Sequence, residues 1–214
     1  MIHVDVDAQD SFARIHSMLQ DVPRGIERAM YGVISRATTT AKTTSLQDIT
    51  TVYDIKAADV RDRKNTTINV VTKTVDDGVI GVISYSGGKI PLIRFGATPQ
   101  YPKQGATVKV RQRKDSPMTT LNNAFVARME SGHIGIFERR PGEYMNKRRG
   151  RSKHSEMIGQ NKRGGKNTDQ FYGSSTPEMA SNAVVFEKVE AATMETIQKR
   201  TEAEITRILN GYGG

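Results

Sequence analysis

The chain has no cysteine among its 214 residues and only four histidines. Without cysteine there is no disulfide scaffold, thiolate metal site or cysteine nucleophile. No two histidines have the spacing of a metal-binding pair, so we expect neither a metal nor another cofactor. No apolar run approaches the roughly 20 residues that a membrane helix needs. The N-terminus is acidic and lacks a hydrophobic signal core, so we expect no export signal and no membrane contact.

Apolar and aromatic residues are also scarce. Hydrophobic residues make up 36% of the chain and aromatic residues 6%, which is low for a compact globule. Segments with few apolar side chains cannot offset the entropy lost on ordering. We therefore expect a modest core, and we expect part of the chain to become ordered only when it meets a partner.

Positive charge is abundant, and it is concentrated in one segment. The formal net charge is +9, and the segment from Arg139 to Lys166 holds ten cations against Glu143 and Glu156, a local net charge of +8. The cations are Arg139, Arg140, Lys147, Arg148, Arg149, Arg151, Lys153, Lys162, Arg163 and Lys166. Such a segment would bind phosphates by releasing counterions, without reading base sequence. An acidic protein surface is an equally good partner, and Lys109, Arg111 and Arg113 would extend either contact.

Apolar spacing predicts three main helices. Residues 8–20 and 182–210 carry apolar residues at helical intervals. The strongest pattern begins at Ile26, with Pro23 placed in the first turn of that helix. A threonine-rich run follows and weakens the pattern, although it is compatible with helix. A further short helix is expected in "YDIKAADVRDRK", ending near Asn65.

Between these helices the apolar period changes from 3.6 to 2. Residues 67–74 and 79–84 are rich in Val, Ile and Thr and flank the turn sequence Asp-Asp-Gly, which predicts a hairpin. The second of these strands is apolar on both faces, which favours a central or doubly covered position. The run "ATVKVRQRK" predicts a half-buried strand with Lys109, Arg111 and Arg113 on its outer face. "NAFVARME" and "HIGIFER" predict a second hairpin.

The order of elements predicts an α+β fold in a single domain spanning residues 1–214. We expect a small, mostly antiparallel sheet flanked by a long N-terminal helix and a long C-terminal helix. Residues 140–173 contain almost nothing apolar, and we expect a long basic loop or arm there.

One motif resembles a catalytic pair. His133 and Glu138 could act as a general base and its orienting partner, as in a nuclease or another hydrolase. In a strand, residues five apart lie on opposite faces, so the pair would need a turn to bring it within hydrogen-bond reach. We favour the alternative in which Ser131-Gly132-His133 turns a hairpin and Gly135 allows close packing. We therefore do not expect an enzyme.

Several blocks together resemble the phage minor tail protein Z family. They are "KIPLIRFGATP", "GATVKVRQRK", "NAFVARMESGHIGIFERR", "YGSSTPEMASN" and the final "TEAEITRILN". Ser174 stands where the family usually has proline. The residues that match the family motifs are Phe125, Met129, Ser131, Gly132, His133, Gly135, Phe137, Arg139, Tyr172, Gly173, Pro177 and Met179.

The resemblance implies a non-enzymatic structural protein of the virion, assembled in the host cytoplasm. Members of this family look like minor tail proteins that complete the head-proximal end of a long phage or prophage tail. The partners implied are the tail terminator, the tail tube and the head-tail connector, with packaged DNA in the lumen. A homo-oligomeric ring, often hexameric in related tail-completion proteins, is also implied, since a head-to-tail interface that closes gives a ring.

Overall fold

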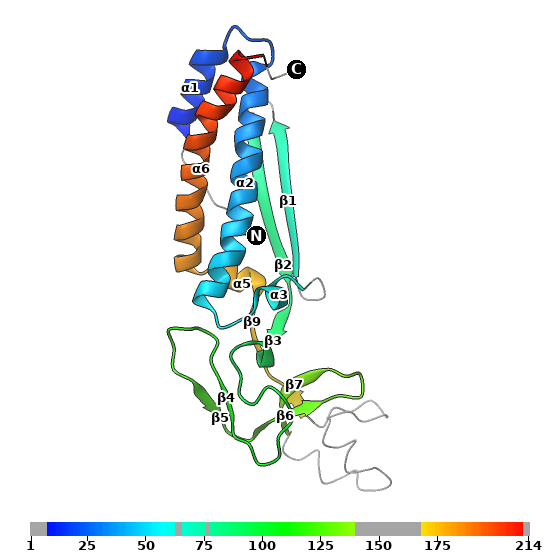
Figure 1. Ribbon diagram of the computed structural model, residues 1–214. Coiled ribbons are helices and arrows are strands. Elements are labelled where there is room, and N and C mark those ends of the chain that lie inside the picture. Colours follow the sequence, from blue (N-terminus) through cyan, green and yellow to red (C-terminus); the bar gives the residue numbers. More distant parts are fainter. Residues whose placement is uncertain (1–7, 63–65, 76–77, 140–167, 212–214) are drawn as a thin grey trace. The chain divides into compact units, whose positions relative to one another are not determined.

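The computed structural model describes residues 8–62, 66–75, 78–139 and 168–211, and its fold class is α+β, as predicted. Its contacts group into two compact units (Figure 1). The helical unit comprises Met1–Ile49, Thr66–Gly87 and Thr176–Gly214, and the sheet unit comprises Thr50–Asn65 and Gly88–Ser175. Where the sequence predicts one domain, each unit has buried residues of its own, and the chain passes between the units several times.

The helical unit contains the long helices that the sequence predicted. Its helices are α1 (Gln9–Leu19), α2 (Gly25–Val52, whose last three residues belong to the sheet unit), α5 (Thr176–Ala180) and α6 (Ala183–Leu209). α1, α2 and α6 pack through a buried apolar cluster that includes Ile15, Leu19, Ala29, Val33, Ala37, Ile197 and Ile205. An exposed ion pair between Arg14 and Glu202 joins α1 to α6. The Asn182 side chain caps α6 by accepting a hydrogen bond from the Val184 N–H at 3.1 Å.

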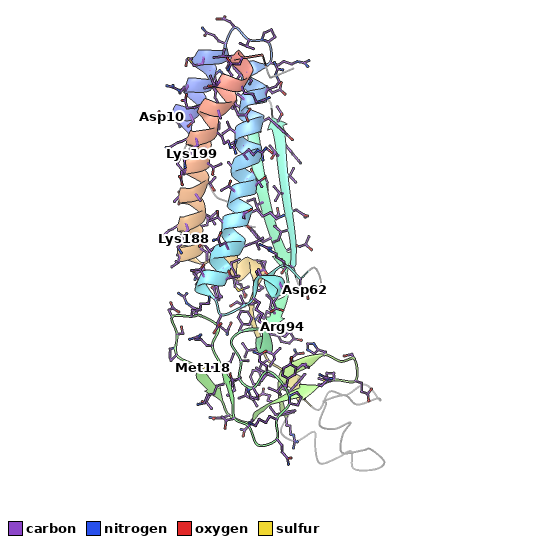
Figure 2. The ribbon with its side chains drawn as sticks, viewed as in Figure 1. Asp10, Asp62, Arg94, Met118, Lys188 and Lys199 are labelled. Carbon is purple, nitrogen blue, oxygen red and sulfur yellow. The ribbon has the colours of Figure 1, made fainter. Side chains whose placement is uncertain are left out.

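The outward side of α6 is charged. Figure 2 labels Lys188 and Lys199 there. Lys199 Nζ lies 2.5 Å from Glu195 one turn earlier, and Lys188 Nζ lies 3.5 Å from Asp48 of α2. Exposed pairs of this kind contribute little to stability. The buried apolar cluster therefore holds this helix in place.

The start of α2 differs from the prediction. Pro23 lies before the helix, which begins at Gly25. Arg24 adopts a φ of 55°, in the left-handed region, and this interrupts the helical backbone. A Cβ on Gly25 would lie 2.8 Å from the Cβ of Val22, so the turn closes too tightly for a larger residue there.

The threonine-rich run is helical, because its hydroxyls find partners within the helix. Thr38 Oγ1 donates to the Ile34 carbonyl at 2.6 Å. In α6, Thr193 donates to Val189 at 2.6 Å and Thr201 to Ile197 at 2.9 Å. A buried hydroxyl that bonds the carbonyl one turn earlier has no unmet hydrogen bond, so threonine fits these buried faces.

A long hairpin completes the helical unit. Strands β1 (Thr66–Val75) and β2 (Gly78–Gly87) pair antiparallel, with Val71 opposite Val82. β2 approaches α2 closely: a Cβ on Gly81 would lie 2.1 Å from Thr38 Oγ1 and 2.9 Å from Ile34 Cγ2. Only glycine permits this separation without a shift of the helix or the strand.

The sequence predicts a central or doubly covered position for the second strand, and within the described residues β2 has neither. In the described residues β2 pairs only with β1, and only its Gly81 face is turned to α2. On the other face Val71, Ile80 and Val82 are 39%, 47% and 36% exposed. In this chain, therefore, a strand with apolar residues on both faces is covered on one face only.

The sheet unit is built from short antiparallel pairs. β3 (Lys89–Pro91) pairs with β9 (Tyr172–Ser175), and β4 (Val108–Val110) pairs with β5 (Thr119–Leu121). β6 (Ala124–Arg128), β7 (Ile134–Arg139) and β8 (Thr168–Gln170) form a three-stranded sheet. α3 (Ala57–Val60) and the 3-10 helix η1 (Leu92–Arg94) complete the unit, joined by an Arg94–Asp59 ion pair of 2.8 Å; Figure 2 labels Arg94.

Three segments predicted in this unit extend beyond the bounds observed in the structure. The short helix ends at Val60 rather than near Asn65. The basic strand ends at Val110, and the side chain of the next residue, Arg111, is held by a hydrogen-bonded ion pair with Asp54. The end of the predicted loop 140–173 is ordered as β8 and the start of β9, and residues 140–167 lie outside the described residues.

The first testable prediction concerns the approach of β2 to α2. Gly81→Ala forces a Cβ into Thr38 and Ile34, so we expect a loss of about 1–3 kcal/mol in the free energy of unfolding. Gly88→Ala is the matched control, because nothing lies within 4 Å of the added Cβ. Urea denaturation followed by circular dichroism measures both variants. Equal stabilities for the two would contradict the close approach.

Candidate functional site

The helical unit contains a groove of about 310 Å³. One side is lined by β2 and the other by α6, with α2 contributing small side chains in between. The α2 residues are Ile34, Ala37, Thr38, Ala41 and Ser45. Four small side chains in this stripe leave space that the neighbouring elements do not fill. The groove is therefore apolar along most of its length, and the start of α1 also lines it, through Ala8 and Phe12.

One end of the groove carries two hydroxyl groups. Ser45 is 3% exposed, and its Oγ has no hydrogen-bond partner among the described residues. Burial raises the pKa of Tyr85 above its ordinary value of 10.0, and the nearby Ser45 hydroxyl opposes that rise in part. The two hydroxyls nevertheless do not reach hydrogen-bonding geometry. Since a buried hydroxyl without a partner is costly, this end of the groove is suited to a further polar group.

Sequence reasoning alone missed this groove. The available signal was Ala37, Ala41 and Ser45 at intervals of four residues on α2, opposite a glycine in a strand otherwise rich in Val and Ile. Such spacing shows that one face of the helix carries small side chains. It does not show which element lies opposite that face.

Of the three cations on the predicted basic face, Lys109 is exposed and the other two bind carboxylates. Arg111 donates from Nε and Nη2 to Asp54 Oδ2, at 2.9 and 2.6 Å. Arg113 donates from Nε to Asp115 Oδ1 at 3.0 Å and from Nη2 to Asp115 Oδ2 at 2.8 Å. These hydrogen bonds lower the pKa of the Asp115 carboxyl. Lys109 alone of the three cations lies in β4, and Arg111 and Arg113, which follow the strand, are paired with carboxylates.

Arg139 is the last residue of β7, where the basic segment begins. Its guanidinium lies over the Phe125 ring, 5.6 Å from the centroid, and Phe125 in turn lies 6.3 Å from Phe137. Beside it is a shallow hollow of about 1190 Å³, lined in part by Lys103, Asn122, Asn123, Phe125 and Arg139. The other predicted contacts lie outside the described residues: Arg140, Lys147, Arg148, Arg149, Arg151, Lys153, Lys162, Arg163 and Lys166.

The Ser131-Gly132-His133 sequence turns the β6–β7 hairpin, as predicted. The Met129 N–H donates to the His133 carbonyl at 2.7 Å, and Gly132 has a φ of 83°. His133 Nε2 lies 2.9 Å from Gln170 Nε2 of β8, so the hydrogen-bond partner of this histidine is an amide. A Cβ on Gly135 would lie 2.9 Å from Phe137 Cζ, which confirms the close packing expected there.

The block "YGSSTPEMASN" contributes residues to β9 and to α5. In β9 a Cβ on Gly173 would lie 2.6 Å from the Phe95 ring, so glycine is needed for this contact. Exposed Tyr172 donates to Gln170 Oε1 at 3.2 Å, and the Ser174 N–H donates to Gln112 Oε1 at 3.0 Å. Pro177 and the fully buried Met179 belong to α5 in the helical unit.

Two kinds of site are absent from the described residues. No cluster of three or more His, Asp or Glu residues is placed to hold a metal ion within those ranges. Among the same residues, no helix combines the length and the apolar character needed to cross a membrane.

Charge divides sharply between the two units. The ranges of the helical unit hold 10 Lys or Arg and 14 Asp or Glu, a net charge of −4. Those of the sheet unit hold 22 and 9, a net charge of +13. Without its segment from Arg139 to Lys166 the sheet unit still carries +5. The whole unit is therefore basic, and the basic segment strengthens a bias that the rest of it already has.

Comparison with family models, with curated proteins and with solved structures finds no match to this chain.

The second testable prediction compares Arg111, which is paired with a carboxylate, with the exposed Lys109. Arg111→Ala leaves the partly buried Asp54 carboxylate without its hydrogen bonds, and we expect a loss of about 1–2 kcal/mol in unfolding free energy. Lys109→Ala, in the adjoining strand, should change that free energy by less than about 0.5 kcal/mol. Thermal and urea denaturation measure both. A Lys109 variant as unstable as the Arg111 variant would contradict these assignments.

Proposed function

We propose that this chain is a structural component of a phage or prophage tail, a tail-completion protein at the head-proximal end. The proposal combines the resemblance of its sequence blocks to minor tail protein Z with one structural observation. That observation is the uncovered face of the β1–β2 hairpin, which carries Val71, Ile80 and Val82. It supports a protein whose hairpin is completed by neighbouring subunits.

The physical argument starts from the weakness of isolated hairpins. Two strands alone are marginally stable in water, and here ten-residue strands receive support from α2 on one face only. Long, flat, apolar edges pair with other chains unless they are covered. Only Lys73 places a charge on the uncovered face among its described residues. A neighbouring subunit in a ring would bury this face and stabilise the hairpin.

The division of charge favours a second candidate function, non-specific DNA binding by the sheet unit. A unit of net charge +13 would attract a phosphate backbone strongly, while the helical unit at −4 would not. Within a tail-completion protein, the same charge would suit a surface past which DNA travels. The two proposals thus differ in whether DNA binding is the primary role or accompanies assembly.

The third testable prediction concerns assembly. The double variant Val71→Glu/Val82→Lys replaces an opposite apolar pair with an attractive charged pair, so the hairpin should persist. We expect monomers where the unchanged protein forms rings, measured by mass photometry and electron microscopy. In the phage or prophage that carries the gene, the variant should leave tails of near-normal length that do not yield infectious particles.

The matched control is Met18→Glu, which removes an exposed apolar side chain from α1 and leaves the hairpin unchanged. We expect this variant to assemble and to restore infectivity to a deletion strain. Normal infectivity of the deletion strain itself would overturn the tail-completion proposal. Rings formed by the hairpin variant would overturn the role of the uncovered face.

The fourth testable prediction concerns DNA. Changing Arg148, Arg149, Arg151 and Lys153 to alanine should weaken binding to duplex DNA at low salt. The slope of log affinity against log salt should become shallower by up to about 0.9 for each phosphate that is no longer neutralised. The control removes the same charge from the helical unit, at the exposed residues Arg36, Lys73, Lys199 and Arg200. Equal effects of the two quadruple variants would show that net charge alone, and no particular surface, drives binding.

A further inference from the structure

The groove in the helical unit has one apolar end and one polar end. At the apolar end, Phe12 and Val79 line it and pack against the buried apolar cluster of the unit. At the polar end lie the hydroxyls of Ser45 and Tyr85. Along α2 the lining residues run from Ile34 to Ser45, which is about 16 Å at the rise of an α-helix. The groove is therefore long, and its two ends differ in chemistry.

Ser45 differs from the threonines that also line the groove. Thr38 donates to the Ile34 carbonyl at 2.6 Å, and Thr193 donates to the Val189 carbonyl at 2.6 Å, so both hydroxyls are satisfied within their own helices. Ser45 makes no such bond, and its buried Oγ has no partner among the described residues. A buried hydroxyl without a partner is costly. The polar end of the groove therefore points to a ligand that supplies the missing hydrogen bond.

The lining of the groove also limits the charge of such a ligand. The described residues that line it include no Lys, Arg, His, Asp or Glu. An ionised group would lose its hydration there and gain no opposite charge in return. The polar group of the ligand is therefore uncharged. An alcohol hydroxyl suits Ser45 best, because each of the two hydroxyls can either donate or accept.

We propose that the groove is a binding site for a small amphiphile, an aliphatic chain that ends in an uncharged hydroxyl. The hydroxyl of the ligand hydrogen-bonds Ser45 Oγ beside Tyr85, and the chain lies along the small side chains of α2 toward Phe12. The volume of about 310 Å³ suits a small ligand of this kind. The bound chain supplies packing that β2, α2 and α6 leave incomplete, so it stabilises the helical unit. This site does not depend on the proposed role in a tail.

The experiment uses the full chain with 1-octanol as the probe. Isothermal titration calorimetry should show saturable binding of one alcohol per chain. Thermal denaturation should show a higher Tm in its presence, because a ligand that binds only the folded state stabilises it. Octylammonium has the same chain and a cationic head, and it should bind much more weakly because no carboxylate lines the groove. No saturable binding of 1-octanol, or equal binding of the two probes, would overturn the proposal.

Two variants locate the bound alcohol. Ser45→Ala removes the hydrogen bond and should weaken 1-octanol binding about five-fold, while the Tm of the free protein stays the same or rises. Ala41→Leu fills the middle of the groove, so a variant shown by circular dichroism to be folded should no longer bind. Ser45→Ala adds no atom and carries the test if Ala41→Leu does not fold. Unchanged affinity in a folded variant, or a lower Tm for free Ser45→Ala, would overturn the assignment.

The matched control is Val71→Thr, on the uncovered face of the hairpin. Val71 is 39% exposed and does not line the groove, and threonine keeps the shape and the strand preference of valine. This variant should bind 1-octanol as tightly as the unchanged protein. A loss of affinity equal to that of Ser45→Ala would show that the alcohol binds the exposed hairpin face, and it would overturn the site in the groove.

Discussion

The helical unit depends on the contact between Gly81 of β2 and Thr38 of α2. A Cβ at residue 81 would lie 2.1 Å from the threonine hydroxyl, so the strand lies too close to the helix for any residue larger than glycine. The small residues of α2 that permit this approach also leave the groove unfilled. The same contact turns Val71, Ile80 and Val82 away from the helix. The groove and the uncovered face are therefore two consequences of one packing arrangement.

The sheet unit also depends on a few close contacts, between a glycine and an aromatic ring and between opposite charges. Its short strands bury little area, and specific contacts hold them: Gly173 against the Phe95 ring, and Asp54 with Arg111. Several residues of the family motifs occupy such positions. Gly132 has a positive φ, Gly135 lies against Phe137, and His133 meets Gln170. These motifs account for the construction of the unit, and they assign no reaction to it.

Local pattern was enough to predict what depends on local energy. The helices from Gln9 and Ala183, the hairpin strands and the Ser-Gly-His turn all follow from periodicity and turn residues. The errors occurred where a distant residue decides the outcome. Arg111 lies beyond the end of β4 and is paired with Asp54, a carboxylate 57 positions earlier in the sequence. β2 is apolar on both faces although only one is covered, and the groove needs Ser45 and Tyr85 from different elements.

The net charge of the whole chain hides how charge is distributed between the two units. A net charge of +9, most of it in one segment, indicated a basic arm on a nearly neutral protein. Once the chain is divided by its contacts, the near-neutral remainder separates into −4 in the helical unit and +5 in the sheet unit. Opposite net charges on two units would favour different partners for each unit. The proposed tail component would join other proteins through its apolar hairpin face and meet DNA through its basic unit. Separating the two charges would keep phosphate from competing with subunits for a single surface.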